Sequence, residues 1–118
     1  MKYTVLKSKI HSAKITAASL EYEGSIEIDE ALMEASGIRE YEKVLVANFT
    51  NGNRYETYVI KGKRDSGEIH VNGTGARYGV TGDKVTIFAF TEIEESESAH
   101  PKIVLVDQTN RVKKIRQP

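Results

Sequence analysis

Hydrophobic and polar residues alternate along most of the chain in short runs, which is the pattern of strands with one buried face. The runs that predict strands are Thr4–His11, Lys14–Ala17, Ser25–Ile28, Lys43–Asn48, Arg54–Lys61, Glu68–Val71, Val85–Thr91 and Ile103–Val106. Many short strands with one or two small helices are typical of a mainly β domain. Periodicity therefore predicts a small, mainly β fold, and a closed β-barrel is the expected architecture.

One helix is predicted directly after the third of these strands. Asp29 can cap its first turn, and Gly37 suits its end. Three apolar residues between these two share one helical face: Ala31, Leu32 and Ala35. This stretch predicts a helix more clearly than any other part of the chain.

Turn-forming residues separate the strands. Asn51-Gly52 predicts a type I′ hairpin turn, because both central residues of that turn need a positive φ. Residues 65–67 (Asp-Ser-Gly) predict a second turn, and residues 72–76 form a glycine-rich loop that a short helical turn can follow. The acidic stretch 92–99 is expected to be a linker, and the basic end 110–118 is expected to fray.

Composition excludes several function classes. Lysine and arginine together number 17, as do aspartate and glutamate, so the formal net charge of the 118 residues is zero. A nucleic-acid-binding domain usually has a basic excess, so no nucleic-acid partner is expected. The absence of cysteine excludes disulfides and thiolate metal sites. The spacing of His11, His70 and His100 does not suggest metal ligation, so no metal is expected.

Targeting signals are also missing from the sequence. No apolar run is long enough to span a bilayer, so no membrane association is expected. The first residues enter an alternating strand pattern directly, without the apolar core of a signal peptide, which predicts a cytoplasmic location.

The Gly24-Ser25 pair allows a particular chemistry, although the same dipeptide usually marks a turn. The serine hydroxyl can attack the preceding carbonyl, because Gly24 has no Cβ to block close approach. The attack forms an oxyanion, which needs donors already in place, and then an ester. Loss of the Ser25 α-proton would eliminate the new acid at Gly24 and leave dehydroalanine, which hydrolyses to a pyruvoyl group.

The Gly24-Ser25 pair becomes informative in combination with other motifs of the chain. Together these motifs resemble the aspartate 1-decarboxylase family, and the resemblance extends from about residue 3 to residue 106. They are Lys9 with His11, Tyr22-Glu23-Gly24-Ser25, Arg54, Thr57-Tyr58 and Asn72-Gly73. The resemblance implies a six-stranded double-psi β-barrel, with residues 1–118 in one domain, assembled as a homotetramer. It also implies self-cleavage into a β chain (1–24) and an α chain (25–118), either spontaneously or with a maturation factor.

The resemblance implies which residues carry the reaction. Ser25 matches the serine that becomes the pyruvoyl cofactor, Tyr58 matches the proton donor, and Thr57 matches a residue that assists cleavage at Gly24-Ser25. The implied reaction converts L-aspartate to β-alanine and carbon dioxide, for pantothenate and coenzyme A synthesis. A ketone joined to the substrate amine as a Schiff base supplies the electron sink, so neither a metal nor pyridoxal phosphate is expected.

Further positions match substrate-binding residues of the family. Lys9 and Arg54 match the basic residues that receive the substrate carboxylates, a contact that suits a guanidinium fork. Thr57, Asn72 and the loop Gly73-Thr74-Gly75 match substrate-contacting positions. This loop departs from the common Asn-Gly-Ala-Ala-Ala pattern at Thr74 and Gly75, which leaves the roles of these two side chains open.

Strand alternation and the resemblance disagree about Thr57. Alternation places Arg54 and Tyr58 on one face of their strand and Thr57 on the other. Either the alternation fails there, or Thr57 acts from another subunit.

Other interpretations stay open at this point. A small β-barrel that binds a partner without catalysis is the alternative function, and such a barrel would need a basic stripe with exposed aromatic rings. A relative that has lost the processing chemistry is a third possibility, although Gly24-Ser25 and Tyr58 are intact. Lys9 and Arg54 could be ordinary solvated charges, and His11 could be a partly buried hydrogen-bonding side chain.

Overall fold

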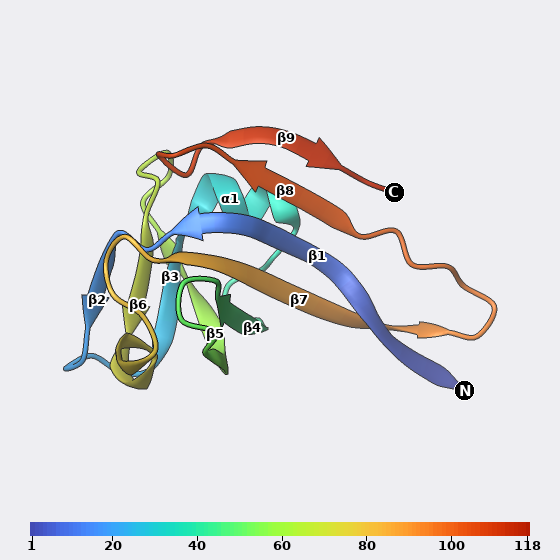
Figure 1. The fold of residues 1–118 in the computed structure, drawn as a ribbon. Coiled ribbons are helices and arrows are strands. Elements are labelled where there is room, and N and C mark those ends of the chain that lie inside the picture. The colour runs from blue at the N-terminus through green and yellow to red at the C-terminus, as the bar shows by residue number, and fades with distance from the viewer.

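The computed structural model describes residues 1–118 as nine strands, one α-helix and one 3₁₀-helix (Figure 1). In chain order the elements are β1 (Lys2–Lys14), β2 (Ala17–Ser19), β3 (Ser25–Asp29), α1 (Glu30–Ser36), β4 (Lys43–Asn48), β5 (Arg54–Gly62), β6 (Ile69–Asn72), η1 (Gly73–Arg77), β7 (Lys84–Glu94), β8 (Lys102–Val106) and β9 (Val112–Arg116). No helix is long and apolar enough to cross a membrane.

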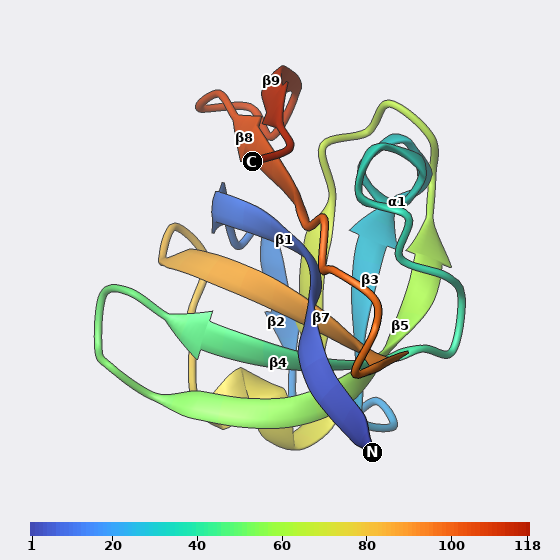
Figure 2. The same cartoon turned by 90° about the vertical axis from the view of Figure 1, so that its right-hand side faces the viewer.

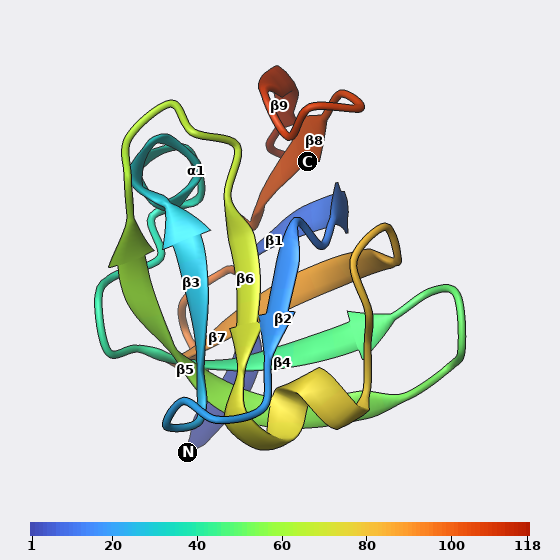
Figure 3. The same ribbon diagram turned by 90° about the vertical axis from the view of Figure 1, so that its left-hand side faces the viewer.

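All nine strands belong to one sheet, in the order β2-β6-β3-β5-β4-β7-β1-β8-β9. Strand β5 joins its two halves, because residues 54–58 pair antiparallel with β4 and residues 59–62 pair parallel with β3. Figure 3 shows β2, β6, β3 and β5 standing side by side, with β4 and β7 crossing behind them. Figure 2 shows β1, β7 and β4 on the other side of the fold, with the β8–β9 hairpin at its edge.

The core lies between these two groups of strands and contains 17 buried hydrophobic residues. Ile26 and Ile28 of β3 and Ile69 and Val71 of β6 are fully buried in it. Since successive side chains of a strand point to opposite faces, the residues that alternate with these four lie on the outer face of the sheet. Ser25, the first residue of β3, is one of them.

The predicted helix is confirmed as α1, and its capping residue also organises a distant turn. The Asp29 carboxylate accepts hydrogen bonds from the backbone N–H of Ala31 at 2.8 Å and from those of Asp65 and Gly67 at 2.9 Å. Gly37 ends the helix with a φ of 76°. A buried carboxylate thus fixes the end of β3, the start of the helix and the 65–67 turn relative to one another.

The prediction of a mainly β fold is confirmed, but the sheet has nine strands instead of the six expected. The short strand β2 and the β8–β9 hairpin extend the sheet at its two ends. The C-terminal residues expected to fray instead form strand β9, so that prediction was wrong. The strand was missed because all of its side chains are exposed. Such a strand has no hydrophobic alternation to reveal it, and its backbone pairing with β8 holds it in place.

Three strand and turn boundaries also differ from the prediction. Strand β1 runs on to Lys14 through two irregularities of register, and Ser12 has a φ of 56°, so the second strand begins only at Ala17. Strand β7 extends to Glu94, into the stretch expected to be a linker. The hairpin between β4 and β5 is present, but only Gly52 has a positive φ, which excludes a type I′ turn.

Candidate active site

Ser25 and Asn72 face each other across the antiparallel pair of β3 and β6. The Asn72 side-chain amide donates a hydrogen bond to Ser25 Oγ at 3.1 Å, and both residues are buried, with exposed fractions of 5% and 4%. The carbonyl oxygen of the Asn72 side chain has no hydrogen-bond partner. The serine hydroxyl is therefore oriented by a fixed donor, and one polar atom beside it is free to receive a further hydrogen bond.

Gly73 packs directly against the backbone of Gly24. Gly73 has a φ of +67°, and a Cβ on it would lie 2.8 Å from both the nitrogen and the Cα of Gly24. By contrast, no atom lies within 4 Å of the position that a Cβ on Gly24 would take. The glycine-rich loop thus presses on one side of the Gly24-Ser25 segment, while the Gly24 Cα has open space beside it.

A hollow of about 650 Å³ opens beside this pair. Its lining residues come mainly from β3, β5 and β6 and from the loops that precede β3 and β4: Tyr22, Glu23, Ser25, Glu27, Tyr41, Tyr58, Ile60, His70 and Asn72. The structure therefore brings together Ser25, Tyr58 and Asn72. The Tyr58 ring is partly exposed, so its phenol can reach a small molecule held in the hollow.

The two basic residues lie elsewhere in the same chain. Lys9 and Arg54 line a second hollow of about 330 Å³ together with His11, Asn48, Phe49 and others, and the two hollows share no lining residue. The Lys9 ammonium lies 5.8 Å from the centre of the Phe88 ring, a cation–π distance. Within one chain, Lys9 and Arg54 therefore line a different hollow from that of Ser25.

His11, in this second hollow, lies in an environment that disfavours its charged form. Burial lowers the pKa of the imidazole, and the nearby positive charges of Lys9 and Arg116 lower it further. Its buried Nδ1 has no hydrogen-bond partner. His11 therefore lines the hollow that contains Lys9 and Arg54 while its Nδ1 stays buried without a partner.

Thr57 and Thr74 line neither hollow. Thr57 is half-buried on β5, whereas its neighbours Glu56 and Tyr58 are exposed, so the strand alternates as predicted and Thr57 faces away from Tyr58. Thr74 is exposed on η1, the segment that begins at Gly73.

Gly75, one of the two departures from the common loop sequence, accommodates an aromatic ring. A Cβ at Gly75 would lie 2.8 Å from the Tyr55 hydroxyl oxygen and 2.9 Å from the ring. Tyr55 stacks on Tyr78 with ring centres 5.3 Å apart, and its buried hydroxyl has no hydrogen-bond partner. Burial raises the pKa of Tyr55 to about 12. The glycine is therefore explained by packing and not by contact with the Ser25 hollow.

Sequence reasoning missed Glu27 and His70, which line the Ser25 hollow. Strand period could have found them, because Glu27 lies two residues after Ser25 on β3 and His70 lies two residues before Asn72 on β6. Once β3 and β6 are known to be neighbours, Ser25, Glu27, His70 and Asn72 must therefore all lie on the outer face of the sheet. That neighbour relationship is not visible in the sequence.

A mainly β domain that buries a hydrogen-bonded serine directly after a glycine agrees with the resemblance seen in the sequence, and wider comparison settles the family. The aspartate decarboxylase family model matches residues 1–113. The chain therefore belongs to the aspartate decarboxylase family.

Individual relatives match along nearly the whole chain. The aspartate 1-decarboxylase of Lactiplantibacillus plantarum is 56% identical over 116 residues, which cover 97% of this chain and 89% of the relative. That of Caldicellulosiruptor saccharolyticus is also 56% identical, covering 98% of this chain and 91% of its own. That of Ralstonia nicotianae is 48% identical, covering 98% of both.

Proposed function

We propose that this protein decarboxylates L-aspartate to β-alanine and carbon dioxide, as the names of its relatives indicate for them, and so supplies pantothenate synthesis. The cofactor of the proposed reaction is a pyruvoyl group formed from Ser25 after cleavage at Gly24-Ser25. The observation that carries the proposal is the hydrogen bond between Asn72 and Ser25 Oγ, in a hollow that also contains Tyr58.

The cleavage requires the Ser25 hydroxyl oxygen to bond to the carbonyl carbon of Gly24 as the peptide C–N bond breaks. The amide of Asn72 restricts the rotation of this hydroxyl, which favours a single direction of attack. Contact between Gly73 and the Gly24 backbone restricts the other reacting partner. Ser25 pairs with Asn72 at the end of the β3–β6 ladder and Gly24 directly precedes it, so the sheet fixes the backbone at the cleavage point.

In the decarboxylation, the pyruvoyl group supplies the sink for the electron pair that carbon dioxide leaves behind. Tyr58 lies in the same hollow as Ser25 and carries a phenolic proton. General acid catalysis needs a donor within hydrogen-bond reach of the carbon that is protonated. Tyr58 is therefore the residue that we assign to protonate Cα of the product.

The substrate's carboxylates need basic partners, and we propose that a second copy of the chain provides them. Lys9 and Arg54 line a hollow that is separate from that of Ser25 within one chain. Exposed aromatic rings border both hollows: Tyr22 and Tyr41 at the first, and Phe49 at the second. Clustered exposed apolar groups favour burial in an interface. We therefore place aspartate between two subunits of the expected homotetramer.

The same assembly offers a role for Thr57, which lines neither hollow of its own chain. Assistance to cleavage or contact with the substrate would then come from a neighbouring copy. We also retain the double-psi β-barrel as the arrangement of the central strands, supported by parallel pairs within an otherwise antiparallel sheet. A cytoplasmic location stays a prediction.

Intact-mass measurement tests the processing. Purified protein should resolve into residues 1–24 and a fragment from 25 to 118 that resists Edman sequencing, because its pyruvoyl end has no free amine. Ser25→Ala should remain one chain, since no hydroxyl attacks Gly24, whereas Thr74→Ala, in the neighbouring loop, should be cleaved normally. Cleavage only after addition of host extract would identify a need for a maturation factor. Wild-type protein that stays intact even then contradicts the proposal.

Mixed oligomers test the shared site. Arg54→Ala and Tyr58→Phe should each lose most β-alanine formation when expressed alone. If the site lies between subunits, co-expression should restore part of the activity, because some sites combine intact Tyr58 from one chain with intact Arg54 from another. Sites built within one chain would stay defective in every mixture. A mixture of the separately purified variants, without subunit exchange, is the matched control.

A further inference from the structure

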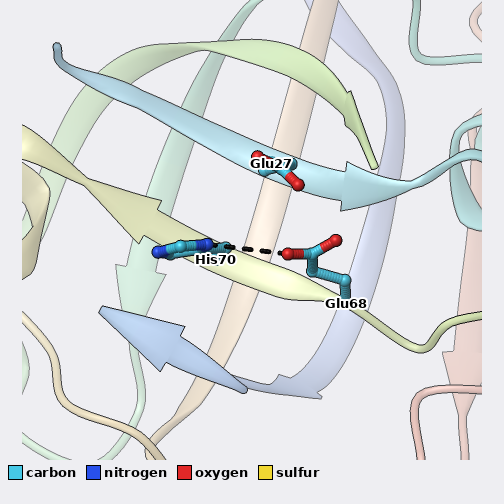
Figure 4. Close-up of side chains that lie close together, drawn as sticks. All are labelled: Glu27, Glu68 and His70. Atoms are coloured by element: carbon cyan, nitrogen blue, oxygen red, sulfur yellow. Dashed lines mark ion pairs between the residues drawn. The ribbon is translucent and has the colours of Figure 1, made fainter. Parts of the chain in front are cut away.

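Three side chains able to bind a metal converge beside the Ser25 hollow: Glu27 of β3, Glu68 just before β6, and His70 of β6 (Figure 4). One ligand atom from each lies within 4.8 Å of the other two. Glu27 and His70 are direct partners in the antiparallel pairing of β3 and β6. The sheet therefore fixes two of the three groups, and Glu68 reaches the same point from two residues further along the chain.

His70 is held with one ring nitrogen directed at the carboxylates. Its Nε2 lies 2.8 Å from Ser19 Oγ on the neighbouring strand β2, and its Nδ1 lies 3.5 Å from Glu68 Oε1. In the tautomer that carries its proton on Nε2, this nitrogen donates to the serine hydroxyl and Nδ1 presents its lone pair toward Glu68. Metal-binding histidines are commonly oriented in this way, by a partner on the nitrogen that does not bind the ion.

Neither carboxylate of the cluster has a lysine or arginine partner. The ion pairs of the lysine and arginine side chains involve other acidic residues, and the close contact of Glu68 is with the His70 ring. Two half-buried acidic groups thus lie together with no fixed cation between them, an arrangement that a bound cation would stabilise.

We propose that Glu27, Glu68 and His70 bind one divalent transition-metal ion of the zinc type on the wall of the Ser25 hollow. One imidazole and two carboxylates are ligands that suit Zn²⁺, and a fourth position would be left open to the hollow. A tetrahedral ion with bonds of about 2.0–2.2 Å holds its ligand atoms roughly 3.3–3.6 Å apart. The 3.5 Å between His70 Nδ1 and Glu68 Oε1 already meets this requirement.

The site is distinct from the groups assigned to cleavage and proton transfer, yet it adjoins them. Glu27 lies two residues after Ser25 on the same face of β3, about 7 Å along the strand. Glu27 and His70 also line the hollow that contains Ser25. The prediction that no metal binds was based on the spacing of His11, His70 and His100 alone. In the cluster proposed here, two of the three ligands are carboxylates.

Calorimetric titration with Zn²⁺ of the purified wild-type protein, freed of metal by a chelator, tests the proposal. We expect one ion per chain, with Mg²⁺ binding far more weakly because it prefers oxygen ligands alone. Glu68→Gln and His70→Gln should weaken Zn²⁺ binding at least roughly 10–100-fold. The two matched controls are His100→Gln and Glu56→Gln, which remove an imidazole and a carboxylate elsewhere on the surface. Both control proteins should bind Zn²⁺ as the wild type does.

Thermal unfolding distinguishes a lost site from a lost fold. Zn²⁺ should raise the Tm of the wild type and of both controls, because an ion that binds only the folded state stabilises it. Folded Glu68→Gln protein should show no such rise. The proposal is overturned if the wild type binds no Zn²⁺ at about 1 mM, or if folded Glu68→Gln and His70→Gln bind it as tightly as the wild type. Neither readout depends on cleavage or decarboxylation, so failure of the proposed activity would leave this test unaffected.

Discussion

The amide of Asn72 donates its hydrogen bond to the one hydroxyl that can attack Gly24, that of Ser25, at 3.1 Å. A hydrogen bond between uncharged groups contributes about 0.5–1.5 kcal/mol, so its loss should slow a step that depends on it by roughly 2–10-fold. We therefore expect Asn72→Ala to be cleaved more slowly than the wild type. Fragment appearance after synthesis, followed by intact mass, measures the rate. Wild-type cleavage in Asn72→Ala would show that the bond has no part in processing.

Gly73→Ala should block or greatly slow cleavage. The new Cβ would lie 2.8 Å from the Gly24 backbone, so the reacting segment must move. Gly82→Ala is the matched control, because Gly82 also has a positive φ, 97°, but no atom lies within 4 Å of its Cβ position. Both substitutions introduce backbone strain of about 1 kcal/mol, which lowers the Tm by roughly 3–6 °C. Equal cleavage of the two variants, measured by intact mass, would exclude a role for the Gly73 contact.

Tyr58→Phe should separate processing from catalysis. Cleavage uses the Ser25 hydroxyl, so this variant should still give both fragments. Decarboxylation should fall by roughly 10²–10⁴-fold, the usual contribution of a general acid. A mass spectrum and a β-alanine assay on one preparation measure both properties. If cleaved Tyr58→Phe turned over aspartate at the wild-type rate, another group would have to deliver the proton.

Tyr55→Phe should leave stability near neutral pH unchanged or slightly improved, because the buried hydroxyl it removes has no hydrogen-bond partner. The pKa of Tyr55 is raised from 10.0 to about 12 in the fold, so the protonated phenol is the form that folding favours. This contribution is fully present below pH 10 and is lost as the pH rises toward about 12. The free energy of unfolding of the wild type should therefore fall more steeply over this range than that of Tyr55→Phe.

Urea unfolding at about pH 7 and about pH 11 measures this difference. Tyr3→Phe, which alters an exposed tyrosine of β1, is the control and should follow the wild type at both values. Parallel behaviour of wild type and Tyr55→Phe at alkaline pH would contradict the assignment of the raised pKa to the Tyr55 phenol.

Local patterns in the sequence determined much of the fold and indicated which residues to propose for the reaction. The Asp29 cap and the Gly37 end of the helix were visible because capping depends on side chains within a few residues. Most strands were visible for the same reason, since alternation is a local property of the chain. The family resemblance pointed to Ser25 and Tyr58, and both residues line one hollow of the structure.

Only the tertiary structure decided which local elements lie together. The exposed strand β9 has no hydrophobic pattern, and it exists because β8 offers it backbone hydrogen-bonding partners. The separation of Arg54 from Tyr58 follows from the path of β5, which pairs with β4 around Arg54 and with β3 beyond Tyr58. The meeting of Glu27, Glu68 and His70 depends on the pairing of β3 with β6. That pairing joins residues more than 40 positions apart, and strand pairing over such distances is set by burial of a shared core, which leaves no local mark on the sequence.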